Sequence, residues 1–179
     1  MPPEANAACV CAREETLEGS QRPYDAQRPR VCLDAGTKHV VQAGRTPLPA
    51  APGRLDRIAY AYERQGTGNL CMRCEPLAGR REGLGTARRT AVDDAEAIQP
   101  LVDVSSPRAE QIVLMQDNLN THTRAALSEA FPPEDARRLS NKLEGHDTPK
   151  HGRWLHMADS ALGVVRGQCL DRRLPDFPT

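Results

Sequence analysis

Two short apolar segments of this chain each lead into an aspartate. Val31-Cys-Leu33 precedes Asp34, and the strongly apolar segment 111–115 is followed, after Gln116, by Asp117. Apolar runs of this length between polar residues are typical of buried strands. Ligands of open α/β sheets collect at the carboxyl ends of strands. We therefore expect Asp34 and Asp117 to stand at strand ends along one functional edge of a sheet.

The remaining patterns predict an α/β domain with a mixed sheet. Alternating apolar residues separated by glycine- and proline-containing turns predict a meander of about four strands in the first half. Thr90 is placed to cap a helix that follows, and Pro132 with Pro133 separates two later helices. Asp159 lies beside the apolar stripe of a last helix. The predicted strands are 31–33, 39–41, 57–63, 69–74 and 111–115, and the predicted helices are 91–102, 123–130, 134–143 and one after residue 152.

The charge balance restricts how the chain can attract its partners. It has 24 basic and 24 acidic side chains and a formal net charge of zero. Because such a chain has no strong overall field, any affinity for nucleic acid has to come from local basic patches. The N-terminal residues lack the basic start and apolar stretch of a signal peptide, and no run of about 18 apolar residues occurs. We expect a cytoplasmic protein without a membrane partner.

Three carboxylates could form a cation site if the predicted elements converge. Asp34 and Asp117 would come from strand ends, and Asp159 from a helix that packs over them. Mg²⁺ prefers carboxylate oxygens together with water and substrate phosphate, and a pair of such ions cleaves or joins phosphodiesters. The alternative for each acid is a solvated turn or a helix cap.

The six cysteines allow a second metal hypothesis. The pairs Cys9/Cys11 and Cys71/Cys74 have spacings that could supply the four ligands of a structural zinc site. The segment around Cys71 and Cys74 has the pattern of a strand, however, and a cytoplasmic chain keeps its thiols reduced. Small buried hydrophobic side chains are the favoured interpretation of these cysteines.

Two longer motifs carry a resemblance to a known family. IVLMQDNLNTH (112–122) resembles the second-aspartate motif of insertion-sequence transposases in the mariner superfamily, and TPKHGRWLHMAD (148–159) resembles their third-carboxylate motif. Val31-Cys-Leu-Asp34 is similar to the first-aspartate strand of the same family. Shorter matches between these segments extend the resemblance over nearly the whole chain. It identifies the chain with a bacterial DDE-type transposase catalytic domain.

This resemblance implies a ribonuclease H-like mixed sheet flanked by helices. It also implies that Asp34, Asp117 and Asp159 hold two Mg²⁺ or Mn²⁺ ions, which serve hydrolysis at transposon ends and strand transfer into target DNA. The implied partners are DNA ends and target DNA, with a homodimer as a further expectation. The candidate DNA-contacting residues are Lys150, His151, Arg80, Arg81, Arg88 and Arg89.

Several residues depart from the pattern that the resemblance leads us to expect. Ala35 replaces a usual Glu, Asp159 a usual Glu, His156 a usual Asn, Arg80 a usual Trp, and Cys71 and Cys74 usual Phe residues. We expect residues 1–28 to be a linker remnant and 29–179 to be the catalytic domain, with the N-terminal helix-turn-helix part absent. The alternatives are an inactive transposase-derived fragment that binds DNA or a partner weakly, and a small zinc module.

Overall fold

A single sheet of five strands organises the fold, in the spatial order β3-β2-β1-β4-β5. The first three strands are antiparallel, and the last two run parallel to β1. Their bounds are β1 (Arg30–Ala43), β2 (Tyr62–Glu75), β3 (Arg80–Thr86), β4 (Ile112–Gln116) and β5 (Leu143–Asp147). The computed structural model describes residues 10, 11, 13, 14, 17, 18, 21–46, 48–57, 60–86, 88–117, 124–148 and 156–174.

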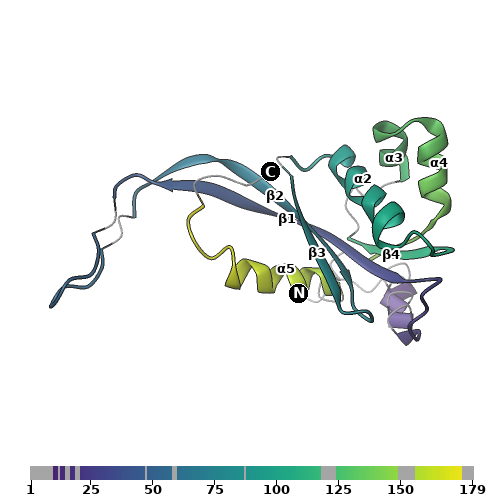
Figure 1. Cartoon of the computed structure of the whole chain (residues 1–179), viewed down its shortest axis with the longest axis horizontal. Helices are drawn as coiled ribbons and strands as arrows, with labels where there is room; N and C mark the ends of the chain where they lie inside the picture. Colours follow the sequence, from purple (N-terminus) through teal and green to yellow (C-terminus); the bar gives the residue numbers. More distant parts are fainter. Residues whose placement is uncertain are drawn as a thin grey trace.

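Helices cover both faces of this sheet (Figure 1). One face carries α2 (Ala91–Pro100), its π-helical continuation η1 (Leu101–Ser105), α3 (Arg124–Ala130) and α4 (Pro133–Asn141). The other face carries α5 (Met157–Gln168). The larger core lies under the first group, where Leu33 and Leu114 of the sheet pack with Ile98, Leu127 and Leu139. A smaller core under α5 consists of Cys32, Cys74, Met115 and Ala158.

Two glycines expected in turns lie inside long strands instead. β1 runs without interruption through Gly36, so the prediction of two strands with a turn between them was wrong. Gly66 has φ 142° within β2, at the point where the register with β1 shifts between Val40 and Val41. That conformation is available mainly to glycine, so Gly66 permits a β-bulge rather than a turn. The four strands predicted in the first half therefore fall on only two, β1 and β2, and the third strand of the meander, β3, was not predicted.

The helical half agrees better with the sequence patterns. Thr90 and Asp93 form a capping box at the start of α2, with each side chain bonded to the other residue's backbone N–H, as the cap prediction required. β4 and α3 match their predicted segments closely. The helix predicted for 134–143 ends at Asn141, and the following residues form β5, which was missed. Only Leu143 of β5 is buried, so its sequence lacks the alternation of apolar residues that would predict a strand.

The outer halves of β1 and β2 form a two-stranded arm that leaves the body of the domain (Figure 1). Pairing with β4 stops at Leu33 and pairing with β3 stops at Asn69, so beyond these points β1 and β2 pair as strands only with each other. Bridges between Leu48 and Arg57 and between Ala51 and Arg54 continue the arm to a tip at Gly53, with φ 75°. Within the described part of the chain, no helix is long and apolar enough to cross a membrane.

Candidate active site

Asp34 lies inside β1 and not at its end, which corrects the expectation from the sequence. β1 continues for nine more residues because β2 remains paired with it. The parallel strand β4, however, ends at Gln116, whose partner in register is Leu33. Asp34 is therefore the first β1 residue beyond the end of β4. Its side chain is 1 % exposed, and Oδ1 accepts a hydrogen bond of 2.7 Å from the Ala35 backbone N–H.

Asp117 follows β4 directly and is half-buried. Extending the parallel register by one position from Leu33 and Gln116 places Asp117 beside Asp34. Side chains at matched positions of neighbouring strands point to the same face, and here this is the face of Cys32 and Met115, under α5. The register thus brings the first two carboxylates together.

Asp159 lies in the first turn of the helix that covers this face. The neighbouring Ala158 is fully buried against Met115 and Cys32, which fixes the height of this turn over the sheet. Met157 and Val164 line a groove between α5 and strands β2 and β3. At about 100° per residue, Asp159 projects from the opposite flank of the helix, toward β1 and β4. Asp159 therefore lies over the same face of the sheet as Asp34 and Asp117, on the side of α5 that is turned toward β1 and β4.

Among the described residues, no group of three or more His, Cys, Asp or Glu side chains lies close enough together to hold a metal ion. The arrangement is a pair of adjacent acids, Asp34 and Asp117, with Asp159 on the helix above them. The chemistry of this donor set is all carboxylate oxygen, which fits Mg²⁺ or Mn²⁺ and not a softer ion. The two segments next to these acids, 118–123 and 149–155, lie outside the described residues.

The negative charge of Asp34 acts on a buried thiol of the neighbouring strand, Cys71. Cys71, which faces Ala35 across the β1–β2 ladder, is 4 % exposed. Burial raises the pKa of the Cys71 thiol to about 12, and the negative charges of Asp94 and Asp34 act in the same direction. The thiol is therefore a neutral core group beside the candidate site.

The fold contradicts the hypothesis of a zinc site that includes Cys71 and Cys74. Cys71 belongs to the core under α2 and α3, whereas Cys74 belongs to the core under α5. Because they lie on opposite faces of the sheet, these two thiols cannot bind one zinc ion. Cys71 and Cys74 are free cysteines, and Cys9 lies outside the described residues.

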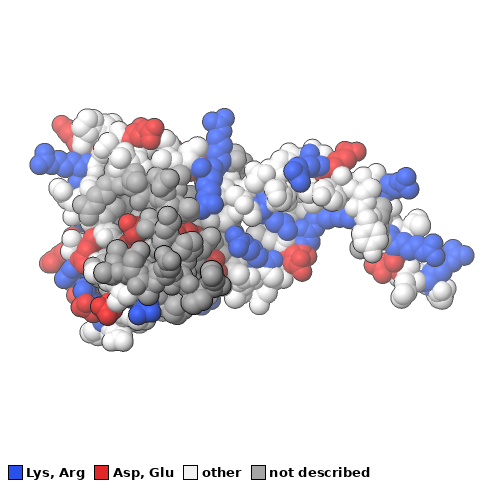
Figure 2. All heavy atoms as spheres, turned by 180° about the vertical axis from the view of Figure 1, so that it is seen from behind, with Lys and Arg blue, Asp and Glu red and all other residues white. Residues whose placement is uncertain are grey.

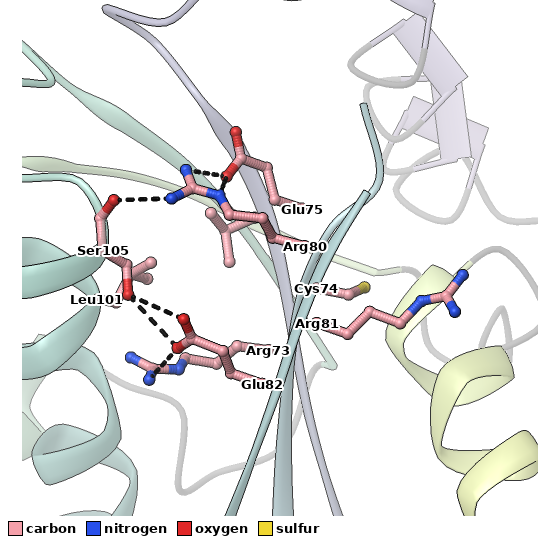
Figure 3. Close-up of a pocket in the computed structure, with 9 residues that line it drawn as sticks. Arg73, Cys74, Glu75, Arg80, Arg81, Glu82, Leu101 and Ser105 are labelled. Atoms are coloured by element: carbon pink, nitrogen blue, oxygen red, sulfur yellow. Dashed lines mark hydrogen bonds and ion pairs between the residues drawn. The ribbon is translucent and has the colours of Figure 1, made fainter. Parts of the chain in front are cut away.

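The candidate DNA-contacting arginines have different surroundings. Arg80 is held on the α2 side of the sheet, where Nε donates to Glu75 at 2.9 Å and Nη1 donates to the Ser105 carbonyl at 3.1 Å (Figure 3). Arg81 points to the other side, toward α5, and lines the groove there (Figure 3). Arg88 and Arg89 are exposed just before α2. Lys150 and His151 lie outside the described residues.

The sequence patterns did not identify Arg166, whose guanidinium lies on β1 two residues beyond Asp34. A Cβ atom added to Gly36 would lie 2.1 Å from Arg166 Nη2, so the guanidinium rests on the glycine itself. Gly36 is two residues beyond Asp34 on the same face, a separation of about 7 Å. The available signal was periodicity, because Arg166 follows Asp159 by seven residues, or two helical turns.

Comparison with known proteins assigns the family. Residues 29–179 match the family described as DDE superfamily endonuclease. The chain belongs to this family. The DDE superfamily domain has no match among curated proteins.

Solved structures of Mos1 transposase share the fold of this DDE superfamily domain. Its structure is similar to the Mos1 mariner paired-end complex with Mn at 19 % identity and a TM-score of 0.59, covering 99 % of this chain and 54 % of that one. It is also similar to the Mos1 strand transfer complex, at 17 % identity and a TM-score of 0.58, covering 99 % and 52 %. The DDE superfamily domain thus spans about half the length of these chains. The ribonuclease H-like fold is confirmed.

Proposed function

We propose that this DDE superfamily domain hydrolyses phosphodiester bonds at DNA ends and transfers the freed 3′-hydroxyl to target DNA. The observation that carries the proposal is the register that sets Asp117 beside Asp34, on the face where α5 presents Asp159. Acids from two strands and a covering helix suit a pair of divalent ions that also bind a substrate phosphate.

Each acid has a distinct part in the proposed site. Asp34 is held rigidly, since it is buried inside a strand and bonded to its own following amide. Asp117 is more exposed and can face both an ion and the substrate. Asp159 would complete the ligand set from above. Bound there, Mg²⁺ or Mn²⁺ would supply a hydroxide from water and stabilise the leaving oxygen.

The basic residues near the site support DNA as the substrate. The exposed Arg166, whose guanidinium lies on Gly36 two residues beyond Asp34, can bind a phosphate adjacent to the one that reacts. Figure 2 shows further basic side chains along the arm, which carries Arg45, Arg54, Arg57 and Arg64. The solved relatives are a paired-end complex and a strand transfer complex, which also supports DNA as the partner. The motifs at 112–122 and 148–159 support an insertion-sequence origin.

A nicking assay with matched aspartate variants tests this function. Asp117→Asn preserves the shape of the side chain but removes a charged ligand. Loss of a residue that only supports a metal ligand lowers activity by up to about 100-fold, so loss of a ligand itself should lower Mn²⁺-dependent nicking of DNA by at least about that factor. The control is Asp147→Asn. Asp147 ends β5 and pairs in register with Gln116, so it lies at the same end of the sheet but on the opposite face from Asp117. Equal activity of the two variants, or an inactive wild type that binds no Mn²⁺, would favour the inactive-fragment alternative.

A further inference from the structure

His156 connects the elements that carry two of the candidate acids. It immediately precedes α5 and is 3 % exposed. Its Nε2 lies 3.1 Å from the carbonyl oxygen of Met115, two residues before Asp117. A carbonyl can only accept, so Nε2 carries the proton in this contact. Nδ1 is buried and has no hydrogen-bond partner among the described atoms.

Two described residues before α5, Thr148 and His156, bond to the end of β4. Thr148 donates its backbone N–H to the Gln116 carbonyl at 2.8 Å, and His156 donates to the Met115 carbonyl. These are consecutive carbonyls at the end of β4. The two bonds therefore fix both residues that flank 149–155 to the strand that leads into Asp117.

The His156 contact sets where Asp159 stands. The Asp159 backbone N–H donates to the His156 carbonyl at 3.1 Å, which begins the first turn of α5. One side-chain hydrogen bond thus links β4, which ends immediately before Asp117, to the turn that carries Asp159. The contact of Ala158 with Met115 keeps that turn against the sheet but, being apolar, does not fix its rotation or its position along the strand.

We propose that His156 is a positioning residue that sets the separation of Asp159 from Asp117. The proposal rests on the proposed function, because the separation matters only if these acids share metal ions. Loss of the Nε2–H donor leaves the Met115 carbonyl buried without this partner and frees the first turn of α5 to shift. A shift of this kind weakens metal binding without removing any ligand.

A pair of variants of equal length isolates the donor. Gln and Met have similar length and volume, but only Gln can place an N–H near the position of Nε2. We expect His156→Gln to bind Mn²⁺ like the wild type in calorimetry and His156→Met to bind about 10-fold or more weakly. His146→Met, at a half-buried histidine that contacts Glu144 in β5, controls for loss of a histidine elsewhere and should leave Mn²⁺ affinity unchanged.

Two measurements on the metal-free protein separate this inference from the proposed function. Hydrogen exchange of residues 157–168 should accelerate at least tenfold in His156→Met and stay near the wild-type rate in His156→Gln. Nitrogen NMR of the wild type should show the His156 proton on Nε2, a test that needs no variant to fold. A proton on Nδ1, or equal exchange and equal Mn²⁺ affinity in the two variants, would overturn the positioning role. Normal exchange behaviour in a wild type that binds no Mn²⁺ would overturn the proposed function and the metal role of His156, but not the anchor itself.

Discussion

At the scale of single residues, the site depends on how closely groups approach the acidic pair. Gly36 illustrates this, because the absence of a side chain lets the Arg166 guanidinium lie on β1 two residues beyond Asp34. The contact involves the far end of a flexible side chain. An added methyl group should therefore displace the arginine without unfolding the protein.

Gly36→Ala is expected to reproduce the effect of Arg166→Ala on DNA binding. Both changes should remove about one phosphate contact and lower the slope of log affinity against log salt by about one. The double variant should bind no more weakly than either single one, because both act on the same contact. Fluorescence anisotropy with labelled DNA over a salt series measures this. Gly163→Ala on α5, where an added Cβ meets nothing within 4 Å, is the control. Unchanged affinity in Arg166→Ala would remove the arginine from the proposed DNA interface.

Burial of the Cys71 thiol should make the free energy of unfolding fall at alkaline pH. Its pKa is about 12 in the folded protein, against an ordinary value of 9.0 when exposed. Between these values the unfolded chain releases the proton first, so stability is fully present below pH 9 and falls as pH rises toward 12. At pH 10.5 the loss should be about 2 kcal/mol. Thermal melts measure how far the unfolding midpoint falls between pH 8 and pH 10.5. This fall should be smaller in Cys71→Ala than in the exposed Cys169→Ala. Equal differences would contradict the burial of this thiol as the cause.

At the scale of elements, local chemistry predicted some segments and long-range pairing decided others. The capping box of α2 and the apolar run of β4 are local signals, and both elements are present. The continuity of β1 through Gly36 depends on its pairing with β2, which lies far away in the sequence. β5, with one buried residue, exists because β4 offers it a parallel partner. A single sequence contains no local pattern for either.

The same distinction explains what could be foreseen of the site. Asp34 and Asp117 were selected because they follow apolar runs, and Asp159 because of its motif and helical position. Their placement on one face follows from strand register and from the packing of Ala158, and neither is readable from the sequence. Arg166 and the Met115 contact of His156 also arise only from the packing of α5 on the sheet.

The capping box of α2 is expected to contribute measurably to stability. Thr90→Ala removes the acceptor of the Asp93 backbone N–H and one partner of the Asp93 carboxylate. Loss of such a cap costs about 1 kcal/mol, so the midpoint of thermal or urea unfolding should fall accordingly. Ser128→Ala, at an exposed hydroxyl on α3, should leave the midpoint nearly unchanged. A Thr90→Ala protein as stable as the wild type would show that tertiary packing alone fixes the start of α2.

At the scale of the whole molecule, the fold separates a rigid acidic centre from an extended basic arm. The acids lie where β1, β4 and α5 meet, in a region packed from both sides of the sheet. The arm carries basic side chains beyond the points where β1 stops pairing with β4 and β2 stops pairing with β3 (Figure 2). Since the net charge is zero, attraction for the DNA substrate that we propose would have to be local, and the arm and Arg166 are the places that would supply it.

A crystal of the wild-type protein grown with Mn²⁺ and measured at the manganese absorption edge tests the central claim most directly. We predict an anomalous peak within about 2.0 to 2.6 Å of carboxylate oxygens from both Asp34 and Asp117, the range for hard divalent ions. Asp159 should lie within reach of the same peak or of a second one beside it. Well-ordered carboxylates without any peak at saturating Mn²⁺, or a peak elsewhere on the molecule, would contradict the metal-dependent function proposed for this domain.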